Sequence, residues 1–156
     1  MSVLCLPAGV YRALCAHAEE CYPAECCGAL FGRPAQRGWQ IQAALRAANA
    51  SVDMAAMRYR IAPAEVAALA REARRLGLEI AGFYHSHPDH AAQWSATDLE
   101  EAHWIGCSYV ILSVERGRAA AVRAFLLAGT REEDKHFEEQ QIVMENFRIG
   151  GRSGSV

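Results

Sequence analysis

The stretch from residue 79 to residue 98 constrains the fold of this 156-residue chain more than any other. Its apolar run ends in His85 and His87 and predicts a β-strand. Side chains two apart on a strand point to the same face, so both imidazoles can reach one metal ion. Asp98 lies eleven positions beyond His87, past a turn that contains a proline, and can supply a carboxylate. The fold is therefore expected to bring the end of this strand close to Asp98.

Two histidines and one carboxylate form a characteristic set of metal ligands. A catalytic zinc site uses three protein ligands and leaves a fourth position for water, whereas a structural site closes all four positions, usually with cysteine. The sequence therefore predicts one Zn²⁺ per chain, bound by His85, His87 and Asp98. The same three donors also describe non-haem iron sites, so iron stays open as an alternative metal on ligand chemistry alone.

Two further side chains suit hydrolysis at such a site. Zinc lowers the pKa of bound water to about 7, so a nearby carboxylate can take its proton. Glu25 is the best candidate for this general base, because a charge is unusual at the entrance of an apolar strand; a solvated carboxylate is the alternative. Ser95, close to Asp98 in the chain, is the candidate for stabilising an oxyanion. Plain capping of the next helix is the other role for Ser95, and the two roles are compatible.

The periodicity of apolar residues predicts an α/β (α+β) fold with a mixed sheet. Helices are expected at 7–21, 63–76 and 95–105, and strands at 25–33, 39–47, 79–87, 108–114 and 118–127. Strict alternation on the strand 79–87 would place Ala81 on the face of Phe83 and the two histidines, and Ile80 on the face of Tyr84. Residues 130–146 are ambiguous, because their charges suit a helix whereas 141–144 could form an edge strand.

The composition excludes several classes of protein. With 22% charged residues and a net charge of −2, no basic surface indicates nucleic-acid binding. No apolar run approaches the roughly 20 residues of a membrane helix, and the N-terminus lacks the basic region of a secretory signal, so a cytoplasmic protein without membrane contact is expected. The six cysteines include no Cys-x-x-Cys pair and are expected to be buried, reduced thiols rather than zinc ligands.

The candidate residues together resemble a known motif. Glu25, then His85-Ser86-His87-Pro88, six residues, and Ser95-Ala96-Thr97-Asp98 resemble the JAMM motif of the MPN-type (MPN+) zinc metalloproteases. The resemblance extends over most of the chain. It implies a JAMM/MPN-type metallopeptidase domain over residues 1–146, with a curved, mostly antiparallel sheet flanked by helices. Residues 147–156 are rich in glycine and serine and are expected to form a flexible tail.

Carried over by position, the resemblance implies roles for the same five residues. It gives His85, His87 and Asp98 as zinc ligands, Glu25 as the general base, and Ser95 as the residue that steadies the tetrahedral intermediate. MPN domains that serve only as scaffolds have typically lost one or more of these residues. This chain keeps all five, which argues against a non-catalytic MPN scaffold.

The resemblance also implies a substrate. The chain has no room for the long insertions of eukaryotic deubiquitinases and looks more like the small stand-alone bacterial members, which process ubiquitin-like (β-grasp) sulfur-carrier proteins. The expected function is hydrolysis of the peptide bond after the carrier's C-terminal Gly-Gly. Glycine lets an extended tail approach the metal closely, and such a tail could also add to a sheet edge. A deubiquitinase-like enzyme or a general small peptidase is the alternative, and the sequence leaves homodimer formation open.

The stretch from residue 49 to residue 61 would lie near the cleft in such enzymes. Arg58 and Tyr59 are candidates to contact a carboxylate or the main chain of a substrate. A role at the edge of the sheet is the alternative for both residues.

Overall fold

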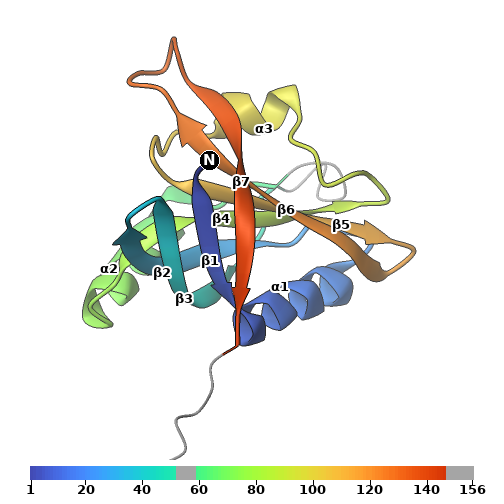
Figure 1. The fold of residues 1–156 in the computed structure, drawn as a ribbon. Helices are drawn as coiled ribbons and strands as arrows, with labels where there is room; N and C mark the ends of the chain where they lie inside the picture. Colours follow the sequence, from blue (N-terminus) through green and yellow to red (C-terminus); the bar gives the residue numbers. More distant parts are fainter. Residues whose placement is uncertain (52–58, 147–156) are drawn as a thin grey trace, which may run out of the picture.

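A computed structural model describes residues 1–51 and 59–146, and within them seven strands and three helices form one closed barrel with flanking helices (Figure 1). The strands are β1 (Val3–Pro7), β2 (Cys27–Ala35), β3 (Gly38–Ala47), β4 (Glu79–Pro88), β5 (Ser108–Glu115), β6 (Arg118–Ala128) and β7 (His136–Glu145). The helices are α1 (Ala8–Cys21), α2 (Pro63–Arg75) and α3 (Ala96–Glu101). The predicted mixed α/β (α+β) class is confirmed, whereas Arg58 and the predicted tail 147–156 lie outside the described residues.

The barrel follows the order β1-β3-β2-β4-β5-β6-β7 and closes where β7 meets β1. The pairs β2–β3, β2–β4, β5–β6 and β6–β7 are antiparallel, whereas β1–β3, β1–β7 and β4–β5 are parallel. The sheet is thus mostly antiparallel, as expected. β4 lies between β2 and β5 and is buried along nearly its whole length, which gives its last residues a rigid support.

Two hydrophobic clusters lie on opposite faces of the sheet. One joins Leu14 of α1 to Leu6 and Tyr84, and the other joins Leu69 of α2 to Phe83. α1 and α2 form where the sequence predicts them because each presents apolar residues to one of these clusters. No helix in the ranges 1–51 and 59–146 is long and apolar enough to cross a membrane.

The face alternation predicted for residues 80–83 is wrong, because β4 contains a bulge. Leu30 pairs with Gly82 and the next residue of β2 pairs with Ile80, so Ala81 is an extra residue on β4. Ala81 therefore joins the cluster of Tyr84, and Ile80 joins the cluster of Phe83. Beyond the bulge the alternation is regular up to the two histidines.

Two strands differ from the expectation. The sequence analysis did not predict β1, whose five residues are too few to show a period, although Leu4 and Leu6 are fully buried. The helix alternative for residues 130–146 is wrong, because residues 136–145 form β7. The charges that suggested a helix lie largely in the preceding turn, where Asp134 accepts hydrogen bonds from the main chain of Thr130 and Arg131.

The third helix is shorter than predicted and ends at Glu101 rather than at residue 105. Lys135 Nζ donates to the main-chain oxygens of Glu100 and Ala102 at 3.1 and 2.8 Å and so satisfies carbonyls at the helix end. Trp104 N–H donates to the hydroxyl of Tyr109 at 3.2 Å instead of to a helix carbonyl. These contacts from outside the helix decide where it stops.

All six cysteines are free, which agrees with the expectation of reduced thiols. Burial is confirmed in part: Cys26, Cys27 and Cys107 are buried, whereas the other three are partly exposed.

Close contact between β4 and β5 requires a glycine at position 82. A Cβ atom on Gly82 would collide with the main-chain oxygen of Ser108. We therefore expect Gly82→Ala to lower the free energy of unfolding by about 2 kcal/mol or more, measured by chemical denaturation. The matched control is Gly9→Ala in α1, where the nearest atom to an added Cβ lies at 3.9 Å, and this variant should not lose stability. Equal stability of the two variants would contradict this account of the sheet.

Candidate active site

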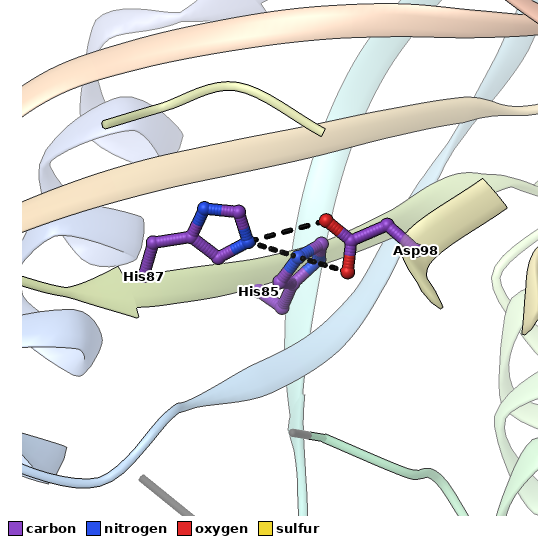
Figure 2. Close-up of side chains that lie close together, drawn as sticks. All are labelled: His85, His87 and Asp98. Atoms are coloured by element: carbon purple, nitrogen blue, oxygen red, sulfur yellow. Dashed lines mark hydrogen bonds and ion pairs between the residues drawn. The ribbon is translucent and has the colours of Figure 1, made fainter. Parts of the chain in front are cut away.

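The end of β4 and the start of α3 bring His85, His87 and Asp98 together (Figure 2). The distance from His85 Nε2 to Asp98 Oδ1 is 3.3 Å, and from His87 Nε2 to Asp98 Oδ2 it is 3.2 Å. The two Nε2 atoms lie 3.0 Å apart. The fold thus places the three predicted ligands at one point, although they come from two elements separated by a turn.

The spacing of these atoms suits a small tetrahedral cation. Zinc–ligand bonds of 2.0–2.1 Å in tetrahedral geometry separate neighbouring donor atoms by roughly 3.3 Å. The three observed separations, 3.0, 3.2 and 3.3 Å, lie close to that value. His87 Nδ1 lies 2.9 Å from Ala91 O, and since a carbonyl only accepts, Nδ1 carries a hydrogen; in the neutral ring Nε2 therefore has the lone pair that a metal requires. These three residues could therefore hold a zinc ion.

The short helix α3 fixes the orientation of Asp98. Ser95 Oγ accepts a hydrogen bond from Asp98 N at 3.0 Å, and Asp98 Oδ2 accepts one from Ser95 N at 2.9 Å. This reciprocal arrangement is a capping box with aspartate at the third helical position. Helix capping by Ser95, one of the two roles expected from the sequence, is therefore present in the structure.

Burial and mutual contact set the charges of the three residues. Burial alone would raise the pKa of Asp98, but hydrogen bonds with His85 and His87 hold it below its ordinary value. Burial lowers the pKa of His85, and Asp98 offsets only part of this effect. Burial also acts to lower the pKa of the less deeply placed His87, but Asp98 and the carbonyl of Ala91 raise it overall. The carboxylate thus stays ionised beside two imidazoles, as a cation site requires.

Glu25 lies beside this cluster, just before β2 rather than on the predicted strand. Its side chain is only 6% exposed, and Oε2 has no hydrogen-bond partner among residues 1–51 and 59–146. Burial raises the pKa of Glu25 to about 8, and the charge of nearby His87 offsets part of that rise. A buried carboxyl group with one oxygen free of hydrogen bonds and a raised pKa is suited to proton transfer.

An open cleft of about 400 Å³ contains these groups. Glu25, His87, Ser95 and Asp98 all line it, so the cleft brings both predicted catalytic residues next to the ligand set. The sequence analysis did not single out three other lining residues: Ala91, Gln93 and Glu101. Their side chains carry no pattern of spacing that would distinguish them from ordinary loop and helix residues.

Tyr59 also lines the cleft, and its ring stacks on the ring of His85 with centroids 4.2 Å apart and an interplanar angle of 19°. It belongs to no strand, so the sheet-edge alternative for Tyr59 is wrong. Its predicted contact with a substrate stays a prediction. The position explains why this residue is aromatic, since the ring covers one face of a buried histidine.

Asn49 is a residue of this region that the sequence analysis missed. Its Oδ1 accepts hydrogen bonds from the main chain of Ser51 and Arg60 at 3.0 and 3.1 Å, and its Nδ2 donates to Glu25 O at 3.4 Å. Asn49 therefore connects the segment that carries Tyr59 to the residue predicted as the base. An asparagine at the start of a loop is a usual signal for such side-chain to main-chain bonds.

Comparison with known proteins agrees with this geometry. Residues 7–127 match the model of the family described as prokaryotic homologs of the JAB domain. The chain belongs to this family. A curated relative, desampylase from Haloferax volcanii, is 35% identical over 124 residues, which cover 77% of this chain and 86% of that protein. We therefore classify the chain as a hydrolase of peptide or isopeptide bonds.

Solved structures show the same fold. The solution structure of a protein from Desulfitobacterium hafniense superposes with a TM-score of 0.78 at 26% identity and covers 92% of this chain and 93% of that one. A protein from Salinibacter ruber gives a TM-score of 0.68 at 33% identity, with coverage of 95% and 94%. The likeness extends over nearly the whole barrel rather than over the motif alone.

Burial of Glu25 should make the metal-free protein less stable at alkaline pH. In the unfolded chain a glutamate ionises near pH 4.5, whereas folded Glu25 keeps its proton up to about pH 8. Within this window the folded state binds more protons than the unfolded state, so stability falls as the pH rises. After chelator treatment, we expect the free energy of unfolding of Glu25→Gln to exceed that of the wild type by on the order of 2 kcal/mol at pH 8. Near pH 4.5 the difference should be small, and urea denaturation measures both values. A gap that does not change with pH would refute this reading of Glu25.

Proposed function

We propose that this protein is a zinc-dependent metallopeptidase that cleaves the bond after the C-terminal Gly-Gly of a ubiquitin-like sulfur-carrier protein. The observation that carries the proposal is the convergence of His85, His87 and Asp98 beside the buried carboxyl of Glu25, whose Oε2 has no hydrogen-bond partner among the described residues. The likeness to a desampylase supports an isopeptidase-like reaction on a ubiquitin-like modifier. A sulfur carrier and zinc are the more specific parts of the proposal.

The metal ligands in this proposal are His85, His87 and Asp98. When bound, zinc supplies a water molecule with a pKa near 7 and polarises the substrate carbonyl. The capping box orients the carboxylate of Asp98, and the bond to Ala91 O fixes which nitrogen of His87 is free. The protein thus prepares three donor atoms before any ligand arrives, which reduces the reorganisation that binding requires.

Glu25 is the proposed general base. Its buried carboxyl with a raised pKa can take a proton from the attacking water and return it to the departing amine. The segment that carries it is fixed to β4, because Cys26 N donates to Ser86 Oγ at 2.8 Å and Ser86 N donates to Cys26 O at 3.1 Å. This pairing keeps Glu25 next to the histidines on either side of Ser86.

Ser95 is the proposed donor to the oxyanion. Its Oγ already accepts a hydrogen bond from Asp98 N, so the hydroxyl hydrogen remains available for donation. Ser95 lines the cleft together with Glu25 and His87. Capping and oxyanion stabilisation therefore use different parts of the same hydroxyl group and do not compete.

The cleft suits an extended chain end better than strand addition. Among the described residues the barrel gives every strand two neighbours, so no strand offers a whole free edge to a substrate. An open cleft with the predicted catalytic groups on its wall can admit a Gly-Gly segment, which has no side chains to exclude. The six free cysteines support a cytoplasmic location.

Removal of one ligand should abolish metal binding. We expect His87→Ala to lose the zinc that the wild type binds at about one ion per chain, because two donors bind zinc too weakly. The matched control is His103→Ala, which removes an exposed histidine outside the cleft and should keep its zinc. Metal content after purification measures both. Stoichiometric zinc in His87→Ala would assign the metal to other ligands, and iron in the wild type would favour oxygenase chemistry.

The reaction itself is tested with a ubiquitin-like carrier that carries extra residues after its Gly-Gly. We expect the wild type to reduce the intact mass of the carrier to the form that ends at Gly-Gly. Glu25→Gln should keep its zinc and lose turnover by at least about 100-fold, since only the base is removed. An unchanged carrier mass with zinc-loaded wild type would reject the carrier as substrate, and full activity of Glu25→Gln would reject Glu25 as the base.

A further inference from the structure

Gln93 lines the cleft from a loop whose main chain is fixed on both sides. The preceding residue, Ala92, is buried and packs against Ile111 and Phe125. The following residue, Trp94, packs on Phe137 with ring centroids 5.6 Å apart. The backbone position of Gln93 is therefore fixed by two apolar contacts, and only its side chain has freedom to move.

A charged network at the surface restrains the side chain of Gln93 as well. Arg123 Nη1 on β6 donates to Gln93 Oε1 at 2.7 Å. The same guanidinium donates from Nε and Nη2 to the two carboxylate oxygens of Glu139 on β7, at 2.9 and 2.7 Å. Its Cζ also lies 5.2 Å from the centre of the Phe125 ring. Arg123 is thus held in place by a carboxylate and an aromatic ring while it binds the amide of Gln93.

The network determines which end of the amide is free. A guanidinium group can only donate hydrogen bonds, so the oxygen of Gln93 must be the atom that faces Arg123. The NH₂ group is then turned away from Arg123 and is available to a molecule in the cleft. A glutamine side chain can in general donate or accept a hydrogen bond. Here its oxygen is bound by Arg123, so Gln93 presents a donor to the cleft.

A bound peptide segment needs such a donor. The main chain of a peptide presents both N–H and C=O groups, and a carbonyl without a partner weakens binding. Three polar side chains of the cleft wall are carboxyl groups, which accept when ionised, whereas the hydroxyl and imidazole groups of the wall can donate: Tyr59, His90, Ser95 and Thr97. The hydroxyl of Ser95 is assigned to the reacting carbonyl, and the amide of Gln93, whose oxygen is bound by Arg123, presents its NH₂ group to a second substrate carbonyl.

We infer that Gln93 is a substrate-binding residue whose amide donates to a main-chain carbonyl of the peptide segment bound in the cleft. Arg123 and Glu139 are positioning residues that hold the amide in the donor orientation. The inference rests on the proposed function, because it requires a peptide in the cleft. It adds a determinant of affinity that belongs to neither the ligand set nor the predicted catalytic pair.

The sharpest test is Gln93→Glu, which keeps the shape of the side chain and its bond to Arg123 but removes both N–H donors. We expect this variant and Gln93→Ala to raise KM for the carrier by about 3- to 10-fold, as loss of one hydrogen bond predicts, with kcat within about 2-fold and zinc content unchanged. The matched control is Gln141→Glu, which adds the same charge at an exposed position of β7 outside the cleft and should leave KM unchanged.

The positioning role is tested with Arg123→Met. In the wild-type background this change should raise KM, because the amide can then rotate; in the Gln93→Ala background it should have no further effect. Unchanged KM in both Gln93 variants, or a loss of kcat without a change in KM, would overturn the inference while the proposed function stands. Absence of carrier cleavage by zinc-loaded wild type would overturn the proposed function and the inference together.

Discussion

The two hydrogen bonds between Cys26 and Ser86 join the halves of the candidate active site. They continue the pairing of β2 with β4 beyond the last regular pair, Cys27 with His85, and so fix the segment before β2 against the end of β4. Ser86 is completely buried and points away from the cleft, whereas the histidines on either side point into it. At the end of β4, Ser86 therefore binds the segment that carries Glu25, whereas His85 and His87 present the predicted metal donors to the cleft.

The turn after β4 shows how the barrel stabilises an unfavourable conformation near the site. Asp89 has a φ of 55°, in the left-handed region that most side chains avoid. Its carboxylate accepts hydrogen bonds from Tyr22 Oη at 2.6 Å and from Arg116 N at 2.9 Å, and its own N–H donates to Val114 O at 2.6 Å. The residue after α1 and the end of β5 with its following turn therefore hold the loop that leads from the histidines to Asp98.

The sequence predicted the site better than the strands that enclose it. The paired histidines, the serine and the aspartate lie within 14 residues and carry local signals of strand, turn and helix cap. The C-terminal end of α3 could not be predicted, because it depends on Lys135 from a distant turn. β1 and β7 depend on each other for burial, and neither has a distinct pattern alone. Arg123 and Glu139 appear in sequence as ordinary surface charges, so their contact with Gln93 emerges only from the pairing of β6 with β7.

The pairing of β1 with β7 joins residues that lie far apart in the chain, with Val3 opposite Gln141. During synthesis on the ribosome, the predicted metal ligands, Glu25 and Ser95 all emerge before the strand that closes the barrel exists. Until residues 136–145 appear, β1 and β6 each lack a neighbour and expose unpaired main-chain groups. Such long-range closure gives the fold a high contact order and hence slow folding, so the newly made chain passes through a stage that is vulnerable to aggregation although the site's own segments are already complete.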